Sequence, residues 1–144
     1  MIAYVDASCV VPLLKLEPKS AALAEYLDDW TEDGHLVVAG ELLETELRRV
    51  ATRFGIAMEQ VTAVLEDITI VAHASIDFRA AGAIPAVIAT AALDAILGSL
   101  DALHLATAMR IGVDALMTDD TVLAEASIQA GIPVLDTSIP RTLI

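Results

Sequence analysis

Acidic side chains that could bind a metal ion together occur in four places along this sequence. Asp6 follows the short apolar run of residues 1–5, and the pair Asp119-Asp120 follows another apolar run at residues 115–117. Both runs are predicted strands, and ligands of open parallel sheets bind beyond the carboxyl ends of the strands. Carboxylates that converge there repel one another unless a cation lies between them, and Mg²⁺ or Mn²⁺ prefers such oxygen ligands. The spacing therefore favours a divalent-metal site.

Two further acids lie on predicted helices. Glu46 lies at the edge of the apolar stripe of a helix expected over residues 41–54, so its side chain can point towards a pocket. Asp101 is in the first turn of an otherwise apolar helix expected over residues 100–111. Both acids are therefore candidates for the same site.

Each acid also has a purely structural interpretation, which the sequence leaves open. Asp6 and Asp120 each precede a predicted helix, where an aspartate can cap the first turn. Asp101 suits the dipole of the helix it begins, and Glu46 alone could be a solvated or ion-paired residue. His104 is expected to pack or to hydrogen-bond rather than to ligate a metal.

The composition indicates one soluble domain with an unusual charge for a protein that handles nucleic acid. The chain has 144 residues, of which 56% are hydrophobic, enough for a sizeable core and too many for a disordered chain. The formal net charge is −13, so nucleic acid would have to be bound through cations or a local basic patch. Aromatic residues make up only 3%, too few for a base-stacking platform.

The sequence predicts a cytoplasmic protein with no membrane segment. Cys9 is the single cysteine, so no disulfide can form within the chain, which fits a reducing compartment. Asp6 interrupts the N-terminus before an apolar core of signal length can form. The uncharged stretch of residues 80–93 is too short to span a bilayer and contains Pro85.

Strands and helices are predicted to alternate along the chain. Strands are expected at residues 1–5, 35–39, 68–72, 115–117 and 133–135, and helices at 10–15, 19–30, 41–54, 58–66, 75–93, 100–111 and 120–130. Most of these strands lack polar alternation, which is typical of a parallel sheet covered by helices on both faces. The predicted fold class is α/β, in a single domain over residues 1–144.

Short motifs along the whole chain, in the same order, resemble those of the PIN-domain ribonucleases. Residues 4–8, YVDAS, are similar to the family's opening strand and Asp-x-Ser, and residues 41–50, ELLETELRRV, to its second motif. Residues 99–108, SLDALHLATA, are close to the third motif, which is the most specific of the four. Residues 117–124, MTDDTVLA, resemble the fourth, and residues 131–134, GIPV, the usual chain ending.

The resemblance implies a fold, an activity and partners. The fold would be a three-layer sandwich whose central five-stranded parallel sheet has the order 3-2-1-4-5, with the first and fourth strands side by side. The activity would be that of a VapC-like toxin, a metal-dependent endoribonuclease that cuts a structured cellular RNA such as a transfer or ribosomal RNA. Such toxins are encoded with an antitoxin whose C-terminal segment covers the active site, and they commonly form homodimers.

The resemblance also implies roles for individual residues. The catalytic acids are expected to be Asp6, Glu46, Asp101 and Asp120. The ligands of Mg²⁺, for which Mn²⁺ can substitute, are expected to be Asp6, Asp101, Asp120 and Asp119, directly or through water. Ser8 and Thr118 would orient the carboxylates, and Arg49 and Arg53 would meet RNA phosphates.

Three positions refine the comparison with the family. Asp120 matches the fourth acid better than Asp119, because Leu123 would then anchor the first turn of the next helix. Gly40 stands where many family members have a serine or another polar residue, and Ala7 replaces a common threonine or serine. Neither of these two differences removes a carboxylate.

Other domains with an acidic pocket are the alternatives. A receiver-like signalling module would need an acidic pair after the first strand and a lysine after the last, but this chain has Asp6 alone and LDT at residues 135–137. A haloacid-dehalogenase-like phosphatase would need a second aspartate where Ser8 stands. A non-catalytic interaction domain of the same fold would have no use for the full set of acids.

Overall fold

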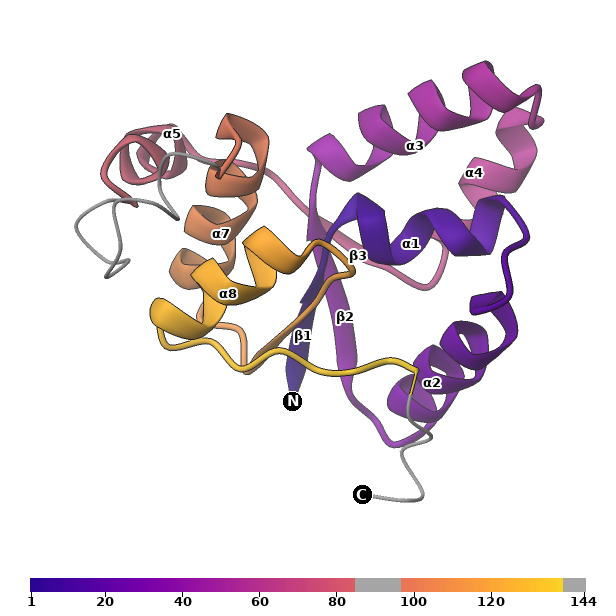
Figure 1. The fold of residues 1–144 in the computed structure, drawn as a ribbon, viewed down its shortest axis with the longest axis horizontal. Helices are drawn as coiled ribbons and strands as arrows, with labels where there is room; N and C mark the ends of the chain where they lie inside the picture. The colour runs from indigo at the N-terminus through magenta and orange to yellow at the C-terminus, as the bar shows by residue number, and fades with distance from the viewer. Residues whose placement is uncertain (85–96, 139–144) are drawn as a thin grey trace.

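The computed structural model describes residues 1–84 and 97–138, and in this part of the chain a parallel sheet is covered by helices on both faces (Figure 1). The strands are β1 (Ile2–Val5), β2 (Leu36–Gly40), β3 (Thr69–Val71) and β4 (Ala115–Met117). The helices are α1 (Ala7–Leu14), α2 (Ser20–Glu32), α3 (Leu42–Phe54), α4 (Met58–Leu65), α5 (Ser75–Gly82), α7 (Ser99–Ile111) and α8 (Thr121–Gln129). The predicted α/β class and parallel sheet are confirmed.

The strands lie in the order β3-β2-β1-β4, so β1 and β4 are neighbours as predicted. Tyr4 of β1 is opposite Val38 of β2, and Val5 is opposite Met117 of β4. All these pairs are parallel, which requires crossover connections, and helices supply them here. The carboxyl ends of β1 and β4 therefore meet at one edge of the sheet.

The predicted fifth strand is reduced to a single bridge. Val134 pairs in parallel with Leu116 of β4, beside which the order 3-2-1-4-5 places that strand. Leu116 donates its N–H to the Pro133 carbonyl at 2.8 Å and accepts from the Leu135 N–H at 2.9 Å. Because proline has no N–H to donate, the ladder cannot extend through Pro133 as an ordinary strand would.

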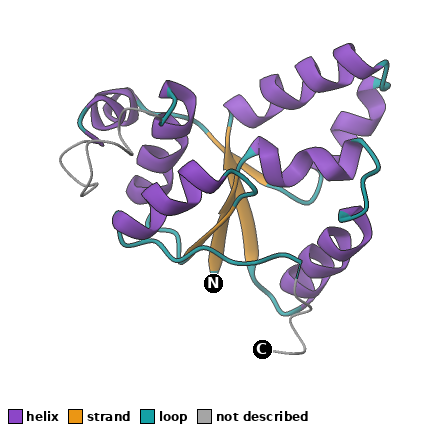
Figure 2. Cartoon of the chain, in the orientation of Figure 1, coloured by secondary structure: helices purple, strands orange, loops and turns teal. Residues whose placement is uncertain are grey.

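The side chains of the strands alternate between two cores, one on each face of the sheet. Ala3 and Val5 point into a core shared with α1, α2, α3 and α4. Tyr4 points to the opposite face, into a core shared with α7 and α8. Figure 2 shows the strands between these two groups of helices. The three layers follow from the period-two alternation of strand side chains.

Two predicted helices have different bounds in the structure. The first was expected over residues 10–15 but begins at Ala7, because Asp6 caps it. The helix expected over residues 75–93 is present as α5 up to Gly82, and residues 85–93 lie outside the described part of the chain. No helix in the described residues is long and apolar enough to cross a bilayer.

Candidate active site at the carboxyl edge of the sheet

Two hydroxyl groups join the end of β1 to the end of β4. The Ser8 Oγ donates to the Asp6 carboxylate, with 2.9 Å to each oxygen, and lies 3.1 Å from the Thr118 Oγ1. Ser8 Oγ accepts from the Asp119 N–H at 3.0 Å, and Thr118 Oγ1 accepts from the Asp120 N–H at 3.0 Å. These contacts fix the backbone after β4 relative to the Asp6 carboxylate. Ser8 and Thr118 thus lie beside the Asp6 carboxylate, and their role in orienting it for catalysis stays a prediction.

Asp6 is the most buried acid of the site, with only 4% of its surface exposed. Burial raises the pKa of its carboxyl group, and hydrogen bonds from the Ser8 and Thr118 hydroxyls and the Cys9 N–H act in the opposite direction. The Cys9 N–H donates to Asp6 Oδ1 at 3.3 Å, which makes Asp6 the cap of α1. The capping role anticipated from the sequence is therefore real. It coexists with the position of Asp6 at the strand end.

Asp101 and Asp120 bring the third and fourth motifs together. Asp101 lies in the first turn of α7, and its pKa is raised to about 6 by burial, then by repulsion from Asp120 and Asp6, while His104 lowers it. A hydrogen bond between the Asp101 and Asp120 side chains raises it further. Three of the four predicted catalytic acids therefore lie close enough to influence one another's ionisation.

Asp120 also begins α8. Its Oδ1 accepts from the Val122 N–H at 2.9 Å and from the Leu123 N–H at 3.1 Å. Leu123 is fully buried and packs in the core between α7 and α8, as the motif alignment predicted for the residue that anchors this turn. The cap leaves Asp120 Oδ2 as the oxygen available for another partner.

Asp119 has a different environment from Asp120. Its carboxylate forms an ion pair with the Lys19 ammonium group, and its side chain is 36% exposed. Lys19 lies just before α2, and its pKa is raised chiefly by the hydrogen bond with Asp119. The structure therefore separates the two neighbouring aspartates: one interacts with Asp101, and the other with a lysine.

Glu46, the fourth predicted catalytic acid, is held by a histidine. Glu46 Oε1 lies 2.7 Å from His104 Nε2, and the Glu46 side chain is 27% exposed whereas that of His104 is 1% exposed. His104 Nδ1 lies 2.6 Å from the Tyr4 hydroxyl, whose pKa is raised by burial. The expectation that His104 hydrogen-bonds is confirmed. The role of Tyr4 was not predicted, because within the sequence it reads as an apolar strand residue.

The predicted RNA-contacting arginines lie on the outer face of α3. Arg49 and Arg53 line a shallow hollow of about 440 Å³ together with Arg48, Thr45 and Thr52. The helical wheel separates Arg48 from the other two, but the structure places all three in this hollow. Arg48 is also paired with a glutamate one turn earlier, at 3.1 Å from Glu44. This is a local basic patch on a chain of net charge −13.

The donor atoms of the acids are of the kind that a hard divalent cation prefers. In residues 1–84 and 97–138 no group of three or more histidine, cysteine, aspartate or glutamate side chains is arranged so that it could hold a metal ion by itself. Mg²⁺ does not need three protein ligands, because it keeps several water molecules and uses one or two carboxylates. In the same residues, Asp6, Asp101 and Asp120 have no lysine or arginine in an ion pair with them. Their mutual repulsion is therefore left for a cation from solution to relieve.

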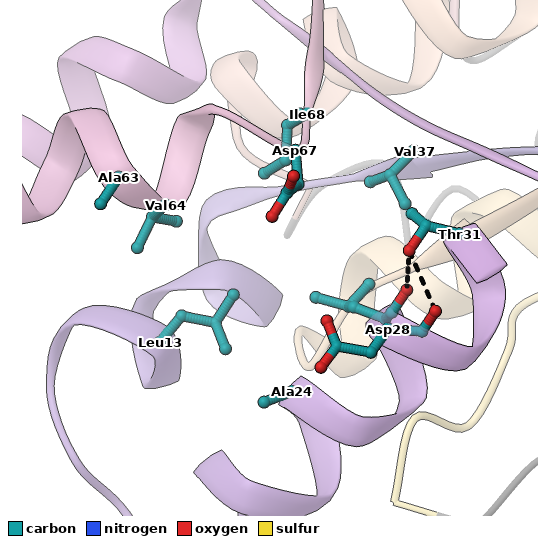
Figure 3. Close-up of a pocket in the computed structure, with 10 residues that line it drawn as sticks. Leu13, Ala24, Asp28, Thr31, Val37, Ala63, Val64, Asp67 and Ile68 are labelled. Atoms are coloured by element: carbon teal, nitrogen blue, oxygen red, sulfur yellow. Dashed lines mark hydrogen bonds between the residues drawn. The ribbon is translucent and has the colours of Figure 1, made fainter.

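A separate apolar cavity of about 270 Å³ lies between α1, α2 and α4. Leu13, Val37 and Val64 are among the residues that line it, and Asp28 and Asp67 lie at its rim (Figure 3). Both carboxylates point towards the open space of the cavity in this view. The cavity thus combines an apolar floor with negative charge.

Comparison with known proteins identifies the family. A family model of the PIN domain matches residues 3–129. The chain belongs to the PIN-domain family. Among curated proteins it is similar to Ribonuclease VapC35 of Mycobacterium tuberculosis, with 36% identity over 128 residues, which is 86% of this chain and 88% of that protein. The predicted membership of a VapC-like group of PIN domains is confirmed.

Two solved structures have the same fold at low sequence identity. One is that of VapBC2 from Rickettsia felis bound to a DNA fragment from its promoter, with a TM-score of 0.71, 12% identity, and coverage of 94% of this chain and 98% of that one. The other is Mycobacterium tuberculosis VapC20, a toxin that cleaves the sarcin-ricin loop, with a TM-score of 0.66, 12% identity, and coverage of 86% and 94%. A PIN fold rules out the receiver-like and dehalogenase-like alternatives.

Proposed function

We propose that this PIN-domain protein is a divalent-metal-dependent endoribonuclease and the toxin of a toxin–antitoxin pair. The observation that carries the proposal is the interaction of Asp6, Asp101 and Asp120 at the carboxyl edge of the sheet. The 36% identity to a protein named Ribonuclease VapC35 supports RNA as the substrate. A non-catalytic domain would gain nothing from a half-buried Asp101 whose pKa is raised by burial and then by repulsion from Asp120 and Asp6.

Asp6, Asp101 and Asp120 would hold Mg²⁺ or Mn²⁺, and Asp119 would contribute at most through water because Lys19 already pairs with it. When bound, such an ion offsets charge on the scissile phosphate and lowers the pKa of a water molecule. Ser8 and Thr118 keep the Asp6 carboxylate in place. Their effect resembles that of the hydrogen-bonding groups around other metal-binding carboxylates.

The arginines of α3 would bind the RNA substrate at a place next to the acids. Arg49 and Arg53 lie one and two turns after Glu46 on the same helix, so a strand of RNA whose phosphates contact them can pass the Glu46 carboxylate. Arginine suits this role because its guanidinium group can donate two hydrogen bonds to one phosphate. A structured RNA, such as a transfer or ribosomal RNA, is the expected substrate.

The antitoxin would use the cavity between α1, α2 and α4 in addition to the active site, which its C-terminal segment would cover. A segment with apolar side chains for the floor and a lysine or arginine for Asp28 and Asp67 fits this surface in both shape and charge. The net charge of −13 would steer such a basic segment towards the protein. A homodimer in the cytoplasm is also expected, and light scattering of the purified protein tests the dimer.

Incubation of the purified protein with total cellular RNA tests the proposed function. Cleavage in Mg²⁺ is expected, with complete loss after chelation by EDTA and recovery when Mg²⁺ or Mn²⁺ is restored. Asp6→Asn is expected to abolish cleavage while leaving the metal-free fold at least as stable, because it removes one of several repelling charges. Cleavage that survives exhaustive chelation, or that Asp6→Asn leaves unchanged, contradicts the proposal.

A further inference from the structure

A chain of hydrogen bonds leads from the end of β2 to the edge of the acid cluster. The Gly40 N–H donates to the Tyr4 hydroxyl oxygen at 3.0 Å. The same oxygen lies 2.6 Å from His104 Nδ1, and His104 Nε2 lies 2.7 Å from Glu46 Oε1. Tyr4 and His104 are fully buried, whereas Glu46 is partly exposed. The chain thus connects the protein interior to a single carboxylate at the site.

The chemistry of these groups fixes the direction of every proton. A backbone N–H can only donate, so Tyr4 accepts from Gly40. A phenol keeps its proton at neutral pH, and the partner that the structure gives this proton among the described residues is His104 Nδ1. The Nδ1 atom therefore accepts, and in the neutral imidazole the proton then lies on Nε2, which donates to Glu46 Oε1.

We infer that His104 is a positioning residue for the reaction, and that it acts in the single tautomer that Tyr4 selects, with Nε2–H holding Glu46 Oε1. This inference rests on the proposed nuclease function. Glu46 then presents its second oxygen, Oε2, in one orientation instead of rotating among several. A hydrogen bond to an ionised acceptor is the stronger kind, so it is well suited to orient a partly exposed carboxylate. His104 does not act on substrate itself, because it is buried and both its nitrogens are used within the protein.

The same network explains why residue 40 is glycine in this chain. A Cβ atom at residue 40 would lie 2.7 Å from the Tyr4 hydroxyl and would overlap the His73 ring. The space that any side chain at residue 40 would need is therefore taken by Tyr4 and His73. His73 is in turn held by the Thr107 hydroxyl, 2.7 Å from its Nδ1. The glycine at residue 40 and the network are thus two aspects of one packing arrangement.

Nitrogen NMR of the histidine side chains tests the tautomer without any need for activity. In the metal-free protein, His104 is expected to show a protonated Nε2 and an unprotonated Nδ1. His35, whose Nδ1 lies 2.9 Å from the N-terminal amino group on the surface, is the internal control. Tyr4→Phe should remove the selection and give a mixture of tautomers at His104. A proton on Nδ1 of His104 in the wild-type protein overturns the inference.

Two substitutions of His104 separate positioning from packing. His104→Gln places an amide NH₂ near the position of Nε2 and can still donate to Glu46, whereas the shorter His104→Asn reaches only towards Tyr4. We expect kcat for RNA cleavage to fall about 10- to 100-fold in His104→Asn, the range typical of groups that orient active-site ligands, with little change in KM. His104→Gln should recover most of that loss, and adding Tyr4→Phe to it should change kcat little further.

Tyr26→Phe is the matched control, because Tyr26 is the other buried tyrosine and lies in the core on the opposite face of the sheet. It should leave kcat and the His104 tautomer unchanged. Equal losses of kcat in His104→Asn and His104→Gln, at equal melting temperatures, overturn the inference. If the wild-type protein does not cleave RNA, the proposed function fails, whereas the NMR experiment still decides the tautomer.

Discussion

Asp101, in the first turn of α7, lies close enough to Asp120, the cap of α8, for the charge of Asp120 to act on its carboxyl group. Burial of Asp101, followed by the charges of Asp120 and Asp6, raises its pKa to about 6. A cation bound between these acids would displace the Asp101 proton, so metal binding should release protons when it takes place at or below about pH 6.

The first prediction concerns the stability of the metal-free protein. Because the pKa of Asp101 is about 6 when folded and near 3.8 ordinarily, the folded state binds more protons between these values, and stability falls as pH rises through this window. His104 opposes the shift, whereas Asp120 and Asp6 favour it. Asp101→Asn should therefore stabilise the protein at pH 7 by about 1 kcal/mol, after allowance for the partial exposure of Asp101.

Denaturant unfolding with EDTA at pH 4, 5, 6 and 7 measures this difference. The gain from Asp101→Asn should be small at pH 4 and largest above pH 6. Asp67→Asn, which alters an exposed aspartate at the rim of the cavity between α1, α2 and α4, serves as the control for general charge effects on a chain of net charge −13. A loss of stability in Asp101→Asn at pH 7 would show instead that the Asp101 carboxylate stabilises the first turn of α7.

The second prediction separates the two neighbouring aspartates after β4. Asp120→Asn should lower the cleavage rate about 100-fold or more, beyond the 10- to 100-fold range of groups that only orient ligands. The metal-free variant should be at least as stable as the wild-type protein, because asparagine caps a helix as well as aspartate does and the repulsion between Asp120 and Asp101 is removed. Asp119→Asn should remove only the ion pair with Lys19, which is exposed and worth at most about 1 kcal/mol. Single-turnover rates at saturating Mg²⁺ compare the two variants, and the reverse ranking would show that Asp119 is the essential acid.

Much of the site follows from the sequence because it depends on local rules. Strand ends and helix starts place Asp6, Asp101 and Asp120, and each obeys a capping or dipole rule that also brings it to the carboxyl edge of the sheet. The order of the strands came from the family resemblance, since local patterns alone do not fix which strands are neighbours.

What the sequence did not reveal depends on contacts between distant residues. Tyr4 and His104 are 100 positions apart, and only the packing of α7 on β1 brings them together. The pairing of Lys19 with Asp119 is equally non-local, so the sequence favours Asp120 by its motif but does not reveal that Asp119 is ion-paired. The full fifth strand was wrongly expected because an apolar run is a weak guide to ladder length next to Pro133.

The third prediction tests the packing around Gly40. Gly40→Ala should destabilise the protein by about 1–3 kcal/mol, the usual cost of overpacking, because the new methyl group overlaps His73 and crowds the Tyr4 hydroxyl. His73→Ala creates space, so the double variant should recover part of this loss, with a coupling energy of about 0.5 kcal/mol or more. Chemical denaturation of the wild-type protein, the two single variants and the double variant gives the four free energies of unfolding from which this coupling energy is calculated. Strict additivity of the two changes would mean that His73 does not limit the space at Gly40.

The fourth prediction concerns the cavity between α1, α2 and α4. Ala24→Phe should fill part of it and weaken binding of the proposed antitoxin about tenfold, a change of 1.4 kcal/mol, without altering RNA cleavage. Asp28→Asn with Asp67→Asn should reduce the salt dependence of the same binding, because these are the charges at the rim. Titration calorimetry at two salt concentrations measures both. Unchanged affinity in Ala24→Phe would place the antitoxin elsewhere on the toxin.

Asp6, Asp101 and Asp120 are proposed to hold together the ion used for RNA cleavage. One Mn²⁺ titration, in which metal binding and the rate of RNA cleavage are followed on the same wild-type and Asp101→Asn samples, tests this role. Binding and cleavage should rise over the same Mn²⁺ range in the wild-type protein, and both should move to higher concentration together in the variant. Full cleavage by Asp101→Asn in the wild-type concentration range would contradict it.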